Sequence, residues 1–399
     1  MPFGTFIDEA SAPALEAQGR ADGLVARQTL RALHVINGEH YAGAERVQDL
    51  LAARLPEFGV ETGFACLKSG CFAAMRQSRQ TPLVELPMRT RFDLRPALRL
   101  ARLVRRERYH LLHTHSPRAL LIARFASALC GVPIVHHVHG NTSSEVASRR
   151  FTRLNAWAER KSLPAAAAVI AVSASVAYYL SGLGVPAERL HVVPNGVPTR
   201  SRLADRSGWP ADGTLGFVAL LRPRKGLETL LDAAALLRSR DLTARLRIVG
   251  RFETSDYERE IRRHAEQLGL AGVIEWRGFQ QRVDAELDRM DVLVFPSILP
   301  EGMPMVLLEG MAAGVPIVAS RVNGITDVVH DREDALLFPP GDAAALADTV
   351  SELIGNRALQ ERLRRTAFDR QREHFSDSSM AVAVADIYRG VLAQKGSRT

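Results

Sequence analysis

The stretch PEGMPMVLLEGMAAGVP, residues 300–316, decides how this chain is interpreted. It follows the apolar run VLVFP (292–296) and precedes a second short apolar run, so the predicted order is strand, loop, helix, strand. Gly302 suits a turn and Pro304 suits a first helical position. The free N–H groups of the first helical turn, near residues 304–307, should face the loop, because a helix N-terminus leaves them unpaired and attracts anions.

Two carboxylates stand eight positions apart in this stretch, Glu301 before the helix and Glu309 within it. Ionised carboxylates accept hydrogen bonds from hydroxyls such as those of ribose and sugar rings. The pair beside an anion site therefore predicts a ligand that carries both phosphate and sugar. A plainer interpretation is that the spacing arises by chance and that the apolar residues between the carboxylates are ordinary core. Those residues include Met303, Met305, Val306, Leu307 and Leu308.

This stretch resembles the E-x7-E signature of the retaining glycosyltransferases of family 4, the glycosyl transferases of group 1. The resemblance implies the two-domain GT-B fold and transfer of a sugar from a nucleotide-diphosphate sugar to an acceptor hydroxyl with retention of configuration. It implies that Glu309 holds the ribose hydroxyls and that Glu301 holds hydroxyls of the donor sugar. The donor-binding residues implied at the helix start, largely through their backbone, are Gly302, Met303, Pro304, Met305 and Val306.

Apolar strands alternate with helices along the chain, which predicts two doubly wound, Rossmann-like α/β domains. The first series of strands is expected at 32–37, 60–66, 83–87, 111–115, 133–140, 167–173 and 190–194. Its helices are expected at 43–58, 96–108, 117–130 and 145–162. The second series of strands is expected at 215–220, 244–250, 273–278, 292–296 and 316–320. Its helices are expected at 225–238, 256–268, 283–290, 304–313 and 342–355.

The domain boundaries follow from this alternation. Residues 1–29 lack a sustained period, and we expect a disordered extension. Residues 30–198 should form the acceptor-side domain and 199–372 the nucleotide-sugar-binding domain, while the fold implies that a helix at about 373–392 crosses back to the first domain. Ligands of such sheets bind beyond the carboxyl ends of the strands, so the cleft between the domains is the predicted site. The segment 323–331 looks like the opening of a further helix.

Lys225 is the predicted cation for the donor diphosphate. It lies in RPRKG (222–226), after the first strand of the second domain, where its ammonium group would meet an anion at the carboxyl end of that strand. The resembled family places an arginine about five positions before this Lys-Gly. This chain has Leu220 there, and we assign the arginine's role to Arg222. The sequence contains no Asp-x-Asp pair to hold a divalent ion, so we expect neither a metal nor a cofactor to be required.

The first domain offers one glycine at the predicted cleft. The segment YAGAERV (41–47) follows the first strand and opens the first helix. The resembled family usually has a Gly-Gly pair here, whose backbone approaches the donor phosphate or the acceptor, and this chain has Ala42-Gly43. Gly43 lacks a Cβ and so allows close approach, although a tight turn would use it equally well.

Histidines follow two strands of the first domain. His139 ends the predicted strand IVHHVHG and resembles the family's cleft histidine, which contacts the donor sugar. His115 also ends a strand, and we place it on the acceptor side. His113 shares a face with His115 but lies deeper. We expect His136 and His137, within the strand, to be core histidines with satisfied hydrogen bonds.

Composition limits the classes of function. The net charge is +8, and residues 31–195 contain 22 Lys and Arg against 11 Asp and Glu, so the basic excess lies in the first half. Aromatic residues are only 6%, and without a zinc-finger spacing or a basic tail we expect no nucleic-acid partner. The three cysteines have no metal-ligand or redox spacing. No apolar run approaches the roughly 18 residues of a membrane span, so we expect a cytoplasmic protein.

The segment RPALRLARLVRRERYH (95–110) interleaves six arginines with apolar residues. One interpretation is a basic amphipathic helix that rests on anionic lipid at the inner membrane surface. This would suit a lipid-linked glycan as acceptor. The acceptors that we expect from the family resemblance are a growing glycan, a polysaccharide, a lipopolysaccharide or a lipid-linked sugar. The other interpretation is an outer helix whose apolar stripe packs on the sheet.

Two other function classes share the predicted architecture. A non-hydrolysing nucleotide-sugar epimerase would convert its sugar without an acceptor. A catalytically silent protein would bind the nucleotide sugar and not turn it over, and the departures at Leu220 and Ala42 keep this alternative open. An NAD-dependent dehydrogenase is disfavoured because neither domain has a full G-x-G-x-x-G after its first strand.

Overall fold

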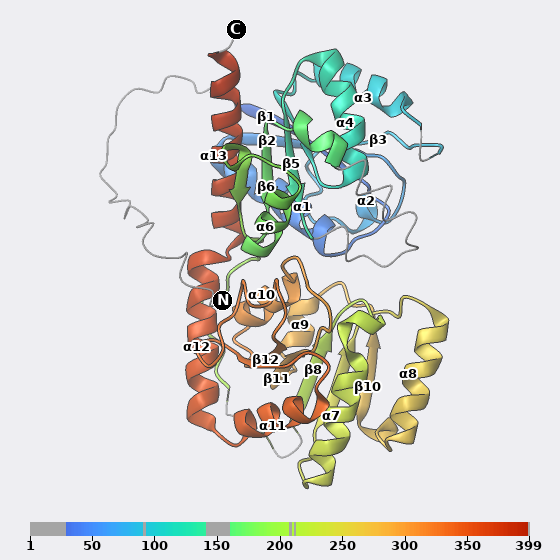
Figure 1. The fold of residues 1–399 in the computed structure, drawn as a ribbon, viewed down its shortest axis with the longest axis vertical. Helices are drawn as coiled ribbons and strands as arrows, with labels where there is room; N and C mark the ends of the chain where they lie inside the picture. Colours follow the sequence, from blue (N-terminus) through green and yellow to red (C-terminus); the bar gives the residue numbers. More distant parts are fainter. Residues whose placement is uncertain (1–28, 91–92, 141–159, 207–209, 211–212, 398–399) are drawn as a thin grey trace, which may run out of the picture.

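The computed structural model describes residues 29–90, 93–140, 160–206, 210 and 213–397. These residues form two α/β units, each built on a twisted parallel sheet (Figure 1). Nearly all of the expected disordered extension and of the helix expected at 145–162 lies outside the described residues. The prediction of two doubly wound α/β domains is confirmed.

The first sheet has the order β3-β2-β1-β4-β5-β6-β7, with every neighbouring pair parallel. Its strands are β1 (Leu30–Ile36), β2 (Val60–Cys66), β3 (Leu83–Glu85), β4 (Leu111–Thr114), β5 (Ile134–Val138), β6 (Ala168–Ala171) and β7 (Leu190–Val192). The α-helices described in this unit are α1 (Gly43–Arg54), α2 (Phe72–Met75), α3 (Arg95–Arg106), α4 (Pro117–Cys130) and α6 (Ala174–Gly182). The strand order reverses between β1 and β4, which places a crevice there.

The second sheet has the order β10-β9-β8-β11-β12-β13 and is also parallel. Its strands are β8 (Thr214–Val218), β9 (Arg245–Val249), β10 (Ile274–Gly278), β11 (Val292–Phe295), β12 (Ile317–Ser320) and β13 (Leu336–Phe338). Its α-helices are α7 (Leu227–Ser239), α8 (Ser255–Gln267), α9 (Val283–Leu287), α10 (Met305–Ala312) and α11 (Ala343–Ile354). The order reverses between β8 and β11, the two strands that precede Lys225 and Glu301.

Local chemistry explains where several elements begin and end. Before α4, the Ser116 hydroxyl accepts a hydrogen bond from the Ala119 N–H at 3.2 Å, and Gly131 follows the helix with a positive φ of 74°. The predicted helix opening at 323–331 is wrong, because residues 323–328 form turns. Gly324 has a φ of 85°, and a Cβ there would lie 2.1 Å from the carbonyl oxygen of Glu301, so its backbone packs against the site loop.

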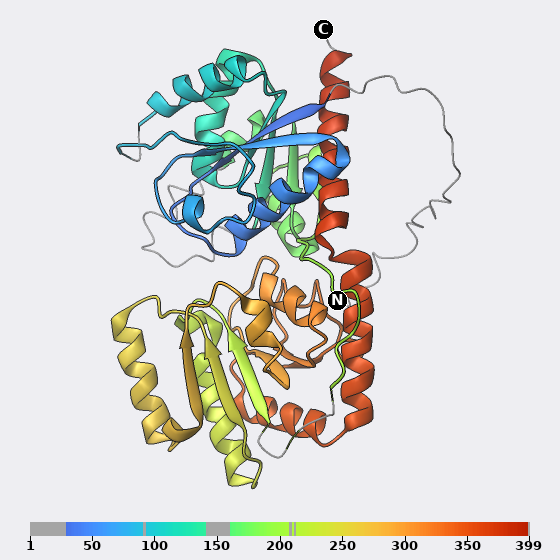
Figure 2. The same cartoon turned by 180° about the vertical axis from the view of Figure 1, so that it is seen from behind.

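Two consecutive helices, α12 (Arg357–His374) and α13 (Asp377–Gly396), connect the units. Both ribbon views show α12 beside the second unit and α13 beside the first (Figures 1 and 2). The Arg54 guanidinium of α1 donates a hydrogen bond at 2.8 Å to Asp377, which anchors the start of α13 on the first unit. The Val197 backbone bonds to Phe375 and Asp377, so the two chain segments that join the units lie side by side.

Candidate functional site

Lys225 and Glu301 meet at the carboxyl edge of the second sheet. Lys225 ends the short 3-10 turn after β8, and Glu301 lies in the loop after the neighbouring strand β11. The Lys225 ammonium donates a hydrogen bond to Glu301 Oε1 at 2.8 Å, and the Ser297 hydroxyl donates to the same oxygen at 2.8 Å. The two side chains are 14% and 9% exposed. Adjacent parallel strands thus bring together two residues that are 76 positions apart.

Burial decides the electrostatics of this pair. Burial raises the pKa of the Glu301 carboxyl, but Lys225 and Arg224 outweigh that effect and hold the pKa below its ordinary value. Burial also lowers the pKa of Lys225, and the attraction of Glu301 only partly compensates. A further anion beside Lys225 would stabilise its charge, as a diphosphate would.

The guanidinium group that reaches Glu301 belongs to Arg224. Its Nη2 lies 3.6 Å from Glu301 Oε2 and donates to the Pro300 carbonyl at 2.8 Å. Arg222 was the arginine predicted from the sequence, and its Nη1 instead lies 3.5 Å from Glu253 Oε1. Both arginines lie in one short segment of the sequence. The conformation of the 3-10 turn determines that Arg224, and not Arg222, faces the Glu301 carboxylate. The assignment of Arg222 to the diphosphate stays a prediction.

A pocket of about 390 Å³ lies beyond the ends of β9 and β10. Its lining includes Arg251, Glu253 and Trp276. Because Glu253 is also the partner of Arg222, this arginine borders the pocket rather than the Lys225–Glu301 pair.

Glu309 of the second unit forms an ion pair with a residue of the first unit. The Arg46 guanidinium, from the first turn of α1, donates a hydrogen bond to the Glu309 carboxylate of α10. Burial lowers the pKa of Arg46, but the attraction of Glu309 raises it by more, so the pKa lies above its ordinary value. The second carboxylate oxygen of Glu309 is buried without a hydrogen-bond partner among the described residues. Arg46 was not predicted as a site residue, although it lies in the segment YAGAERV (41–47) at the start of α1.

The loop around Gly302 touches the first unit backbone to backbone. A Cβ on Gly302 would lie 1.9 Å from the carbonyl oxygen of His139 and 3.0 Å from the Cα of Gly140. Gly43, the exposed first residue of α1, lies opposite Met305, since a Cβ there would be 3.8 Å from the Met305 Cγ. Glycine is thus required at 302 by a close approach, whereas at 43 the space would admit a methyl group.

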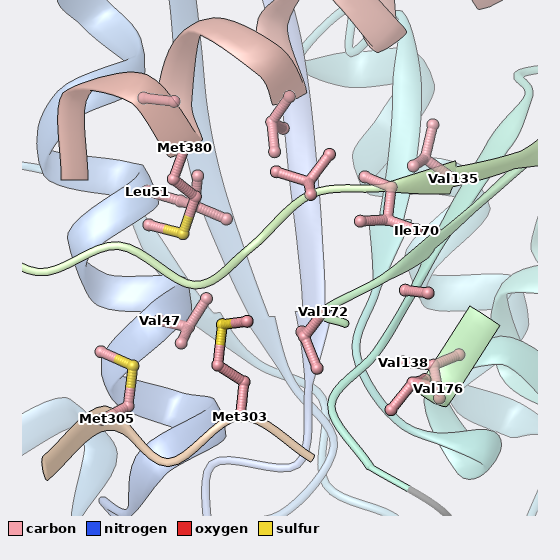
Figure 3. Packing of buried hydrophobic residues seen from close by; sticks show 14 of the residues in the cluster. Val47, Leu51, Val135, Val138, Ile170, Val172, Val176, Met303, Met305 and Met380 are labelled. Carbon is pink, nitrogen blue, oxygen red and sulfur yellow. The ribbon is translucent and has the colours of Figure 1, made fainter. Parts of the chain in front are cut away.

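Met303 of this loop and Met305, the first residue of α10, fill the space between the units. Met303 and Met305 are 6% and 5% exposed and belong to the same hydrophobic cluster as Val47 and Leu51 of α1 (Figure 3). The Asn195 amide donates a hydrogen bond to the Met303 carbonyl at 3.0 Å. The core interpretation therefore holds for both side chains, and a role for their backbone N–H groups stays a prediction.

The helix after this loop begins one residue later than the sequence suggested. Pro304 is the N-cap of α10, with a ψ of 119°, and Met305 is its first residue. The Leu307 N–H already bonds to the Pro304 carbonyl at 3.2 Å, while Val306 is half-buried against the hydrophobic cluster. The N–H groups available to an anion are thus fewer than the sequence suggested. The donor-binding roles of Pro304 and Val306 stay predictions.

A chain of hydrogen-bonded rings leads from α13 to His139, whose backbone lies against Gly302. The Tyr388 hydroxyl lies 3.3 Å from His34 Nε2, and His34 Nδ1 lies 3.1 Å from His115 Nε2. His115 Nδ1 then lies 3.1 Å from His139 Nε2. His113 contacts the same tyrosine through Nδ1 at 2.5 Å. The structure therefore joins His115 and His139, the two histidines selected from the sequence, and adds His34 and Tyr388 behind them.

The two histidines expected to be satisfied core residues are both buried, but neither is fully hydrogen-bonded. His136 Nδ1 contacts the Thr114 hydroxyl at 2.8 Å, while its Nε2 has no hydrogen-bond partner among the described residues. His137 is fully buried, yet neither ring nitrogen has a hydrogen-bond partner among the described residues. The expectation for His137 is wrong, because the neighbouring rings stack on it and offer it no hydrogen bond.

These histidines are neutral in the folded chain. Burial lowers the pKa of His34 and His139 to about 3 and that of His136 to about 4. Burial, reinforced by repulsion from neighbouring histidines, lowers the pKa of His113, His115 and His137 well below the ordinary value. Within the described residues, three side chains close enough to share a metal ion occur only in this histidine cluster, in two overlapping sets. The expectation that no metal is required stays a prediction.

Two family models match most of the chain. Residues 41–201 match the family described as Glycosyltransferase Family 4, and residues 203–370 match Glycosyl transferases group 1. The chain belongs to these group 1 glycosyltransferases. As a family member it is 33% identical over 265 residues to a phosphatidyl-myo-inositol mannosyltransferase of Mycobacterium leprae, over 64% of this chain and 66% of that protein. It is 35% identical over 184 residues to the putative colanic acid biosynthesis glycosyltransferase WcaL of Salmonella typhimurium, over 43% of this chain and 44% of that protein. The chain thus spans less than two thirds of either relative.

Solved structures establish the fold of this glycosyltransferase. Anabaena Alr3699/HepE in complex with UDP and glucose matches with a TM-score of 0.79 at 21% identity, over 90% of this chain and all of that one. Sucrose-phosphate synthase from Thermosynechococcus elongatus matches with a TM-score of 0.78 at 21% identity, over 92% of this chain and all of that one. The fold is GT-B, as the resemblance implied. In the described part of the chain, no helix combines the length and apolar character needed to cross a bilayer.

Proposed function

We propose that this group 1 glycosyltransferase moves a sugar from a nucleoside-diphosphate sugar to an acceptor hydroxyl with retention of configuration. The observation that carries the proposal is the contact of Lys225 with Glu301, because it places a cation and a hydroxyl acceptor at the carboxyl edge of the sheet. The Glu301 loop also touches the His139 backbone, so the first domain forms the opposite wall. The solved structure of HepE with UDP and glucose supports the donor class.

The chemistry follows from the leaving group. As the bond between the anomeric carbon and the diphosphate oxygen breaks, negative charge grows on the diphosphate. Lys225, with Arg222 or Arg224, stabilises that charge, so no divalent ion is needed. The acceptor oxygen forms the new bond on the same face of the sugar, and its proton passes to the departing diphosphate oxygen. Retention follows because bond formation and bond breaking share one face.

The two carboxylates position the donor. Glu309 accepts hydrogen bonds from the ribose hydroxyls once Arg46 releases it, and Glu301 accepts them from the sugar. Gly43 lies across from Met305, on the side from which the first domain approaches the donor. The pocket beside Arg251 and Trp276 is the proposed place of the base, because it lies at the same sheet edge and offers an aromatic side chain.

The acceptor is a growing glycan or a lipid-linked sugar, held on the side of His115. The names of the mannosyltransferase and of WcaL agree with such acceptors. We also propose a peripheral contact with anionic membrane through α3, whose outward residues include Leu98, Arg99 and Arg102.

A binding and turnover experiment tests this function. Thermal shifts with UDP, GDP and ADP identify the base, because a ligand that binds only the folded state raises the melting temperature. The matching nucleotide sugars are then incubated with polysaccharide fragments and lipid-linked acceptors in the presence of EDTA. We expect release of the nucleoside diphosphate and an α- or β-linkage equal to that of the donor, read by NMR of the anomeric proton.

Other outcomes overturn the proposal. An isomerised nucleotide sugar formed without an acceptor would show an epimerase. Tight nucleotide binding with no turnover on any acceptor would show a silent binding protein. Inversion of the linkage, or transfer abolished by EDTA, would contradict the mechanism.

A further inference from the structure

We propose that His115, His137 and His139 form a binding site for a divalent transition-metal ion of the Zn²⁺ and Co²⁺ type at the wall of the cleft. The ion takes no part in sugar transfer. The ion is a second ligand of the same region, and when bound it prevents His139 from contacting the donor sugar.

The sheet brings these three rings together. In the parallel register Thr114 pairs with His136, so the next residues lie side by side, His115 directly after β4 and His137 within β5. His139 follows two residues after His137 and points to the same face. The rings of His137 and His139 stack with centroids 4.4 Å apart, and that of His115 lies 5.6 Å and 5.4 Å from them.

The nitrogen positions suit a shared ion. One nitrogen from each of the three rings lies within 4.8 Å of the others. A tetrahedral ion with bonds of about 2.1 Å to imidazole needs its ligand nitrogens roughly 3.4 Å apart. His115 Nδ1 and His139 Nε2 are 3.1 Å apart and nearly meet this spacing. A small rotation of the His137 ring supplies the third ligand.

His137 also lacks other partners. Neither of its ring nitrogens has a hydrogen-bond partner among the described residues. Buried polar atoms are nearly always paired, so nitrogens in this state indicate a missing ion or water.

Residues behind the site hold one ring in a ligating orientation. His115 directs Nε2 to His34 Nδ1, which leaves Nδ1 for the ion. His34 is held in turn by the Tyr388 hydroxyl. Metal-bound histidines characteristically use their second nitrogen in this way, and loss of such a partner typically weakens metal binding 10- to 100-fold.

The set of His34, His113 and His115 is less suitable. Its members are at most 7% exposed, and Tyr388 already occupies a nitrogen of both His34 and His113. His139, by contrast, is partly exposed directly after β5, so an ion can reach the chosen site from the protein surface.

A Co²⁺ titration of the full chain, treated with chelator and without donor, tests the site. We expect a saturable visible absorption with one Co²⁺ per chain, displaced by Zn²⁺. His137→Ala should weaken binding at least tenfold, and Tyr388→Phe should weaken it less. His136→Ala is the matched control, because it removes a buried histidine of the same strand whose ring contacts Thr114, and it should bind Co²⁺ normally.

Several results would overturn the site. One is the absence of saturable absorption in chain whose circular dichroism is native. Another is equal binding by His137→Ala and the unaltered chain, with His115→Asn as a second variant if His137→Ala does not fold. Only the inhibitory effect rests on the proposed function: Zn²⁺ should raise the apparent KM for the nucleotide sugar at least threefold. Metal binding without this effect would count against the role of His139 and not against the site.

Discussion

Arg46 of the first domain donates a hydrogen bond to Glu309 of the second, 263 positions away. Glu309 is also the carboxylate proposed to hold the nucleotide ribose. In the structure without nucleotide, the Arg46 guanidinium therefore binds the same carboxylate that is proposed to accept hydrogen bonds from the ribose. On the proposed role of Glu309, the ribose hydroxyls compete with Arg46 for this carboxylate, so the free energy of the ion pair opposes nucleotide binding.

Replacing Arg46 by Gln should therefore tighten nucleotide binding by about threefold to tenfold, because partly exposed ion pairs contribute on the order of 1 kcal/mol. Isothermal titration with the nucleoside diphosphate that gives the largest thermal shift measures the change. Arg54→Gln is the control, since Arg54 lies on the same helix but bonds to Asp377. Weaker binding by Arg46→Gln would mean that Arg46 itself contacts the nucleotide.

Lys225→Ala should lower turnover by about 10² to 10³, the scale for removing one preorganised charge stabiliser. The variant also leaves Glu301 with Arg224, so the carboxylate keeps one cation and the fold should persist. Steady-state release of the nucleoside diphosphate gives the rate, with Lys395→Ala in α13 as control. Near-normal turnover in Lys225→Ala would remove this lysine from the mechanism.

The sheets were predictable because each strand is a short apolar run between turn residues. β2 (Val60–Cys66) and α4 (Pro117–Cys130) match the predicted bounds to the residue. The helix α6 (Ala174–Gly182) was missed, because the apolar run before it hid the capping signal of Ser173, whose hydroxyl accepts from the Val176 N–H.

The site was predictable only where its residues follow adjacent strands of one sheet. Glu301 and Lys225 follow adjacent strands at a reversal of strand order, which the alternation of elements implies. The Arg46–Glu309 pair depends on the relative orientation of two domains, and no local pattern encodes that orientation. The unpaired nitrogens of His137 depend on the register of β4 and β5 and on ring rotations, which the sequence does not express.

Gly302→Ala should impair catalysis by at least tenfold without lowering the stability of either domain. The added methyl group would lie 1.9 Å from the His139 carbonyl oxygen, so the second domain must move away from the first. Turnover and small-angle scattering measure the two effects, and the radius of gyration should rise. Gly272→Ala, where a methyl group meets no atom within 4 Å, is the control. A fully active Gly302→Ala enzyme would show that this close contact is dispensable.

Acid should destabilise the chelator-treated protein below about pH 6.5. The pKa values of His34 and His136 fall to about 3 and 4 on folding, so between these values and 6.5 the unfolded chain binds more protons. The contribution of these histidines to the free energy of unfolding is fully present above pH 6.5. It is lost as the pH falls, by about 1.4 kcal/mol per pH unit for each histidine. Urea midpoints at pH 7.5 and 5.5 measure the loss. His136→Gln should reduce this pH dependence by about one proton, and equal midpoints at both pH values would contradict the prediction.

Membrane contact can be tested on the face formed by α3 and α4. Leu100, Leu103 and Val104 of α3 are buried, as the packing interpretation requires, but Leu98 and Phe125 are 49% and 42% exposed. Exposed arginines lie on the same two helices, among them Arg99, Arg102 and Arg124, and each arginine near an anionic surface contributes about 1 kcal/mol at low salt.

We therefore expect the chain to sediment with vesicles containing phosphatidylglycerol at low salt and to be released at high salt, because salt screens the attraction. Vesicles of phosphatidylcholine alone should not retain it. The double variant Leu98→Ser, Phe125→Ser should bind at least threefold more weakly, whereas Tyr178→Ser should bind normally, since this tyrosine is 85% exposed on α6, outside the face of α3 and α4. Failure to sediment at low salt would exclude peripheral attachment through this face.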